Sequence, residues 1–307
     1  MRNAYLSALH DLAKADKNIL ALISDNGAIV YDKFRADFPE QYTNCGISEA
    51  NMVGMAAGLA SSGKIPFAYT ISNFLVYRAY EQIRNDVCLQ NMNVKLVGIG
   101  VGFVYSSLGP THHGTEDIAV MRCLPHMTIF SPADPLETKK VTLAAAAIKG
   151  PVYIRLATGG TPAVYEKDYD FSAGKAVEII PGNDIALCST GSSVHEVLLA
   201  VKELKKRGIS ARLVNFHTIK PIDREMIVKA ASETGRILVV EEQNMDGGLA
   251  GAISEVLLEE GWGKVAFRRM GLKDTFTQGY GTYDDLKDLN GLSKAHIMAA
   301  VHEMVGI

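Results

Sequence analysis

The 307-residue sequence has few of the features that mark secreted, membrane or zinc-binding proteins. Its four cysteines are scattered singly, which argues against a disulfide framework and against the usual spacing of zinc ligands. No apolar run approaches the length of a membrane span, and the first residues predict an amphipathic helix rather than a signal peptide. We therefore expect a cytoplasmic protein with no membrane partner.

Neither sign of charge is in excess. Thirty-one Lys and Arg residues against thirty-four Asp and Glu residues leave a net charge of −3, which gives no electrostatic basis for nucleic acid as a partner. A Walker A loop, a dinucleotide fingerprint and a G-x-S-x-G elbow are also absent. The run GIGVG at residues 98–102 does not open a helix, so we expect only close packing at a strand end. Phosphate-loop enzymes and α/β-hydrolases are therefore not indicated.

The order of apolar segments predicts the fold class. Short apolar runs alternate with helix-like stretches in both halves of the chain, which predicts an α/β fold of two domains. Each domain is expected to hold a mostly parallel sheet with helices on both faces. The expected boundaries are residues 1–165 for the first domain, 166–182 for a linker and 183–307 for the second domain. The strands are expected at 19–23, 66–70, 94–99, 127–130, 152–155, 185–189, 211–216, 237–241 and 265–270.

The most informative segment is GISEANMVGMAAGLA, residues 46–60, because it places one carboxylate in the first turn of an otherwise uncharged helix. Apolar residues recur there at helical spacing, and Gly and Ala fill the gaps. Such a helix packs closely along most of its surface, so its only acid, Glu49, needs a hydrogen-bond partner where water is scarce. The simpler interpretation is a helix-start glutamate facing the positive end of the helix dipole.

A second segment, SSLGPTHHGTED at residues 106–117, follows the strand expected at 94–99. Loops at the carboxyl ends of parallel strands line the ligand crevice of an open sheet. Two adjacent imidazoles in this loop, His112 and His113, can polarise a carbonyl or move protons near neutral pH. Alternatively, each ring is structural and bonds to a neighbouring polar group.

Together these segments resemble the thiamine-diphosphate enzymes of the transketolase and deoxyxylulose-phosphate synthase type, and the resemblance covers essentially the whole chain. Residues 46–60 resemble the pyrimidine-domain motif of that family, residues 71–87 its cofactor-facing strand and helix, and residues 109–122 its Gly-x-Thr-His loop. Three further runs, at 187–209, 214–223 and 239–257, resemble its C-terminal domain.

The resemblance implies a role for several residues. Glu49 matches the glutamate that bonds a pyrimidine nitrogen of thiamine diphosphate and favours the imino tautomer. Phe74 and Tyr77 stand where aromatic residues pack on the aminopyrimidine, and Asp25 matches an acid near the cofactor. For Tyr77 ordinary core packing, and for Asp25 a turn or helix-cap role, are equally open. His112 matches the histidine that contacts the donor ketose.

The substrate side of the site departs from the family pattern. Leu108 stands where transketolases have an acid that bonds a donor hydroxyl, Gly100 where they have a sugar-contacting histidine, and Val101 where the synthases have an arginine. Loss of such contacts changes substrate preference, because a polar group left unpaired is penalised. His113 and Arg155 remain candidate substrate contacts, the latter for an anionic sugar terminus, with an ion pair as its alternative. The usual pentose donors, a modified ketose phosphate and another anionic sugar fit equally well.

The resemblance also implies a second polypeptide. The family's Gly-Asp-Gly motif followed by an Asn, which holds Mg²⁺ and the diphosphate, is absent from this sequence. We therefore expect the C-terminal half of a split transketolase, with no metal ligands of its own. It would work with an N-terminal subunit on sugar substrates, as a self-associating dimer within an α2β2 assembly. The alternatives are the β subunit of the decarboxylating component of a 2-oxo acid dehydrogenase and a non-catalytic assembly module.

Overall fold

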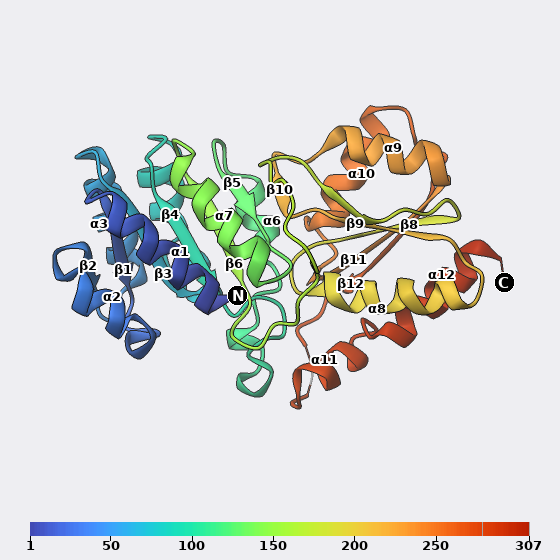
Figure 1. Cartoon of the computed structure of the whole chain (residues 1–307), viewed down its shortest axis with the longest axis horizontal. Coiled ribbons are helices and arrows are strands. Elements are labelled where there is room, and N and C mark those ends of the chain that lie inside the picture. The colour runs from blue at the N-terminus through green and yellow to red at the C-terminus, as the bar shows by residue number, and fades with distance from the viewer. Residues whose placement is uncertain (278, 307) are drawn as a thin grey trace.

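The computed structural model describes residues 1–277 and 279–306, and it contains two sheets that lie side by side (Figure 1). The first sheet runs, from edge to edge, through β10 (Thr218–Lys220), β5 (Thr128–Phe130), β6 (Val152–Leu156), β4 (Lys95–Ile99), β3 (Ile65–Ile71), β1 (Ile19–Ile23) and β2 (Tyr42–Asn44). The second runs through β12 (Ala266–Leu272), β11 (Arg236–Asn244), β8 (Ile185–Ser189), β9 (Ala211–Asn215) and β7 (Val177–Ile180). β10 pairs antiparallel with β5 and β7 with β9, while the other neighbours run parallel.

Helices cover both faces of each sheet, which confirms the predicted α/β class. In the first half the helices are α1 (Arg2–Ala15), α2 (Asp32–Asp37), α3 (Glu49–Ser61), α4 (Ser72–Arg78), α5 (Tyr80–Gln82), α6 (Asp117–Arg122) and α7 (Pro135–Ala147). In the second half they are α8 (Ser193–Lys206), α9 (Arg224–Thr234), α10 (Leu249–Glu259), α11 (Tyr283–Leu289) and α12 (Lys294–Val305). α1 packs against α7 on one face of the first sheet, and α8 and α12 lie opposite α9 and α10 in the second half (Figure 1). No helix in the described part of the chain is both long and apolar enough to cross a membrane.

The predicted strands are present with ends shifted by at most three residues, because most of them are buried apolar runs. β2, β7, β10, α2 and α11 were not predicted. β2 and β10 have three residues each, too few for a period to show, and β7 lies within the stretch expected to be a linker. The helix expected within residues 71–87 is instead α4, α5 and a π-helical turn at Ile83–Cys88, with a break at Ala79. The domain boundaries themselves stay a prediction.

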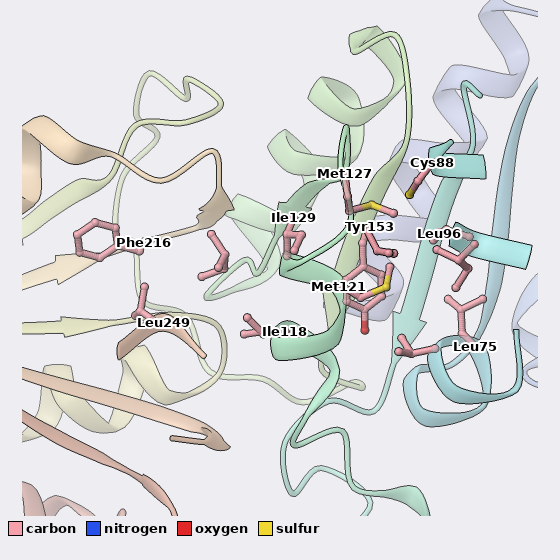
Figure 2. Close-up of a cluster of buried hydrophobic side chains, with 14 of the residues drawn as sticks. Leu75, Cys88, Leu96, Ile118, Met121, Met127, Ile129, Tyr153, Phe216 and Leu249 are labelled. Carbon is pink, nitrogen blue, oxygen red and sulfur yellow. The ribbon is translucent and has the colours of Figure 1, made fainter. Parts of the chain in front are cut away.

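The two halves share a core rather than meeting across a thin surface. β10 belongs to the second half of the sequence but pairs with β5 at the edge of the first sheet. One cluster of buried side chains includes Ile118 and Ile129 from the first half with Phe216 and Leu249 from the second (Figure 2). The carboxyl end of the first sheet is therefore held in a fixed relation to the second sheet.

Candidate active site at the carboxyl end of the first sheet

The start of α3 is tied to the end of β1. The Ser24 hydroxyl, directly after β1, donates to the Gly46 carbonyl oxygen at 3.0 Å and accepts from the Ser48 backbone N–H at 3.2 Å. Gly46 has φ +70, a backbone conformation that glycine adopts without strain. These bonds fix the turn before α3 and place Glu49 at its first position, where the side chain is only 4% exposed.

Glu49 is not left without a partner. The Arg78 guanidinium donates from one nitrogen, Nη1, to both Glu49 carboxylate oxygens, at 3.2 and 3.1 Å. The guanidinium carbon of Arg78 also lies 3.8 Å from the centre of the Phe74 ring, within the range of a cation–π contact. Phe74 and Arg78 are four residues apart on α4, and this spacing puts both on one face of the helix. A flat, hydrogen-bonding cation therefore lies between the carboxylate and the aromatic ring.

His112 also lies beside Phe74. The two rings are 5.1 Å apart in an edge-to-face arrangement, and the Tyr105 ring is 6.2 Å from His112. Thr111 Oγ1 lies 2.9 Å from His112 Nδ1, and the Asn73 amide donates to the Thr111 carbonyl oxygen at 3.3 Å, which ties the loop to the start of α4. Burial and then the nearby Arg78 charge lower the pKa of His112, so the imidazole is neutral near pH 7.

The structure thus brings Glu49, Phe74 and His112 together from three separate segments, and it places the other candidates around them. His113 is 1% exposed, its ring lies 5.9 Å edge-to-face from Phe103, and burial lowers its pKa. It faces the interior rather than the loop surface. Leu108 is half exposed on the same loop, as an apolar neighbour of the site would be.

Tyr77 and Asp25 lie at the rim. Tyr77 is 44% exposed and its hydroxyl donates to Glu116 at 3.1 Å, and its packing on the cofactor stays a prediction. Asp25 has φ 55 and exchanges two hydrogen bonds with the Asn44 side chain, at 3.1 and 3.0 Å. This geometry gives Asp25 a role in the turn after β1.

The position of Arg155 differs from the expectation that this residue contacts an anionic sugar terminus, and agrees with the alternative of an ion pair. Its guanidinium is 4% exposed and binds both Asp117 oxygens, at 2.6 and 3.0 Å. The remaining donors meet Ser131 Oγ and the Gly114 carbonyl oxygen, each at 3.2 Å. The expectation failed because Arg155 points into the junction between the two halves, where the Gln243 side chain also donates to Asp117.

Two glycines at the end of β4 and just after it are closely packed, and one of them, Gly100, is a departure from the family pattern. Gly100 has φ +82, and a Cβ atom there would lie 1.9 Å from the Tyr105 ring, so Tyr105 fills the space that a side chain at 100 would need. A Cβ at Gly98 would lie 2.8 Å from the Tyr153 hydroxyl, which confirms close packing at the end of β4. Sequence reasoning missed Arg78 as a site residue. The available clue was its position four residues after Phe74 on the expected cofactor-facing helix.

A buried first-turn glutamate, an aromatic ring and a histidine loop lie together at the carboxyl end of the first sheet, which is the arrangement expected of the pyrimidine-binding half of a thiamine-diphosphate enzyme. Residues 1–162 match the transketolase pyrimidine-binding domain, and residues 174–297 match the transketolase C-terminal domain. The chain belongs to the transketolase family.

Relatives of matching length sharpen this assignment. The chain is 37% identical over 306 residues to an apulose-4-phosphate transketolase subunit of Phocaeicola vulgatus, covering 99% of this chain and 97% of that protein. It is 36% identical to a 6-deoxy-6-sulfo-D-fructose transketolase subunit of a Clostridium species, covering 99% and 94%. A solved structure described as a split gene transketolase, inactive β4 tetramer, superposes with a TM-score of 0.91 at 38% identity, covering 99% and 98%. The chain therefore corresponds to the C-terminal subunit of a split transketolase, a transferase that works with a partner subunit.

Proposed function

We propose that Glu49 and Phe74 hold the aminopyrimidine ring of thiamine diphosphate, on which the family depends. The observation that carries this proposal is the position of the Arg78 guanidinium, which donates to Glu49 and has its carbon 3.8 Å from the centre of the Phe74 ring. A flat group with N–H donors therefore fits between the carboxylate and the ring. An aminopyrimidine offers the same shape and, when protonated on its ring nitrogen, the same donor. The residues present thus fit the pyrimidine end of the cofactor.

Glu49 would share a proton with the ring nitrogen of the bound pyrimidine. Its 4% exposure keeps water from competing, which strengthens a hydrogen bond in this low-dielectric setting. When bound, the cofactor supplies the nucleophilic carbon that takes up and passes on a two-carbon unit. Phe74 orients the pyrimidine by stacking, while Tyr77 and Asp25 stabilise the rim of the site through their bonds to Glu116 and Asn44.

His112 is proposed to contact the donor ketose. Its ring is half buried beside Phe74, and its lowered pKa leaves a neutral imidazole that can accept a proton from a hydroxyl or donate to an oxygen. His113, fully buried behind it, is proposed to support the loop rather than to touch the substrate.

The substrate is proposed to be a ketose donor and an aldose acceptor, with an anionic group on at least one of them. The two similar subunits are named for a sugar phosphate and for a sugar sulfonate. These names support an anionic sugar as the substrate but do not identify which one. The half-exposed Leu108 provides an apolar surface beside His112, where no donor hydroxyl would be bonded. Arg155, committed to Asp117 in the interior, is withdrawn as the anion-binding group.

Mg²⁺ and the cofactor diphosphate are proposed to be held by the N-terminal partner. Within residues 1–277 and 279–306 no group of three or more His, Cys, Asp or Glu side chains is arranged to hold a metal ion. Two copies of this chain and two of the partner would form two equivalent sites with closed two-fold symmetry. On α3, Gly54 and Gly58 leave open space beyond their Cα atoms, which suits close approach of another chain.

Mixing the two purified subunits tests this proposal. Neither subunit alone should transfer a ketol unit, and activity should appear on mixing only with both thiamine diphosphate and Mg²⁺ present. Light scattering should report a heterotetramer for the mixture. Turnover by this chain alone would contradict the proposed division of the site.

A further inference from the structure

We propose that Arg78 is a latch that occupies the pyrimidine site of the free subunit and is displaced when the cofactor binds. The inference rests on the proposed function of Glu49 and Phe74. It assigns to a third residue a role in setting the affinity and timing of cofactor binding.

The first argument is shape. The guanidinium makes contact with the two side chains expected to hold the cofactor ring: it donates to the Glu49 carboxylate, and its carbon lies 3.8 Å from the centre of the Phe74 ring. Both contacts use the space between the same two side chains. The guanidinium and the aminopyrimidine therefore cannot occupy that space together.

The second argument is that Arg78 is free to leave. Its side chain is 47% exposed, whereas that of Glu49 is 4% exposed, so the arginine reaches into the site from the solvent side. An arginine charge returns to water at little penalty, whereas a glutamate this deeply buried needs a partner in every state. The latch thus supplies the partner that Glu49 requires until the cofactor replaces it.

The third argument links the latch to the histidine loop. The Phe74 ring contacts both Arg78 and His112, and the Arg78 charge is one of the two causes that lower the pKa of His112. Withdrawal of the guanidinium removes that cause. The titration of His112 therefore reports whether the latch is closed, independently of catalysis.

Competition of this kind weakens cofactor binding, and the effect grows as the fraction of time that the site is open becomes smaller. The apparent dissociation constant equals the intrinsic one divided by the open fraction, so a latch closed about nine-tenths of the time weakens binding about tenfold. Arg78→Met removes both the charge and the flat group. Arg78→Lys keeps a charge for Glu49 but not the flat stack, and should be intermediate.

The experiment measures thiamine diphosphate affinity by titration calorimetry in the mixed complex with Mg²⁺. Arg78→Met should bind the cofactor about tenfold more tightly than the wild type. The matched control is Arg84→Met, an exposed arginine in the π-helical turn that follows, which bonds Asn85 rather than Glu49, and its affinity should not change. Equal or weaker binding by Arg78→Met would overturn the latch.

A second measurement follows His112 in the free subunit. NMR titration should show a higher pKa for His112 in Arg78→Met than in the wild type, because the Arg78 charge that helps to lower it is then absent. An unchanged His112 pKa in free Arg78→Met would mean that the guanidinium does not lie beside the histidine loop in the free subunit, and would also overturn the latch. If the wild-type complex failed to bind thiamine diphosphate at all, the proposed function would fail. Binding with no difference between wild type and Arg78→Met refutes the latch alone.

Discussion

Replacing Asp117 by asparagine should test whether Arg155 holds the two halves of the molecule together. Asp117 is fully buried and accepts hydrogen bonds from Arg155, Tyr153 and Gln243, the last from β11 of the second sheet. Asp117→Asn keeps the size of the side chain but removes its negative charge and one acceptor oxygen, so the Arg155 cation, 4% exposed, is left with neutral acceptors only, among them Ser131 Oγ and the Gly114 carbonyl oxygen. Removing one partner of a buried ion pair costs about 3–5 kcal/mol.

The assay is urea unfolding of the isolated chain, with the free energy of unfolding taken from the midpoint and slope. The double variant Asp117→Asn/Arg155→Met should recover part of the loss, because no unpaired charge then remains buried. Glu255→Gln is the matched control. Glu255 also pairs with an arginine across the two halves, at 2.6 Å from Arg122, but is 59% exposed, so its loss should cost under about 1 kcal/mol.

Two results would refute this reasoning. A loss of less than about 1 kcal/mol for Asp117→Asn would mean that the buried network contributes little to stability. The second result would be a stable Arg155→Met variant whose KM for an anionic donor, measured in the mixed complex, is much higher than that of the wild type. Arg155 would then be a substrate contact.

The remaining predictions concern two histidines. His112→Ala in the mixed complex should slow the donor half-reaction by ~10²-fold while cofactor affinity changes little, and an unchanged single-turnover rate would make His112 structural. His217 is buried beside Phe171, and burial lowers its pKa to about 4. The folded state therefore binds fewer protons than the unfolded state between about pH 6.5 and 4, and stability should fall as the pH drops through that window. His217→Gln should reduce this loss by up to about 3 kcal/mol, measured as unfolding free energy at pH 7 and pH 4, and an identical pH dependence would contradict the assignment.

Much of the fold could be predicted because burial left a plain pattern. Strands such as β1 and β8 are continuous apolar runs, and α7 begins at a proline after the N-cap Asp134. β10 could not be predicted, since its three residues pair with a strand some ninety positions earlier in the sequence. A short stretch of sequence carries no information about a partner strand so far away along the chain.

The candidate site divides in the same way. The position of Glu49 follows from one helix and its turn, and both are local in the sequence. Its pairing with Arg78 spans 29 positions, and that of Arg155 with Asp117 spans 38, so both depend on how strands and helices are placed against each other. A sequence shows that an arginine is present near a predicted strand end. It does not show which way the side chain points.

The most direct test of the whole account is the activity of Glu49→Gln in the mixed complex. The amide keeps the shape of the side chain but cannot share a proton with the pyrimidine as a carboxylate does. Assembly, followed by sedimentation, should be unchanged, while kcat for ketol transfer should fall far below one-tenth of the wild-type value. Retention of more than about a tenth of wild-type kcat, a difference of only ~1.4 kcal/mol in the barrier, would contradict the central role of Glu49.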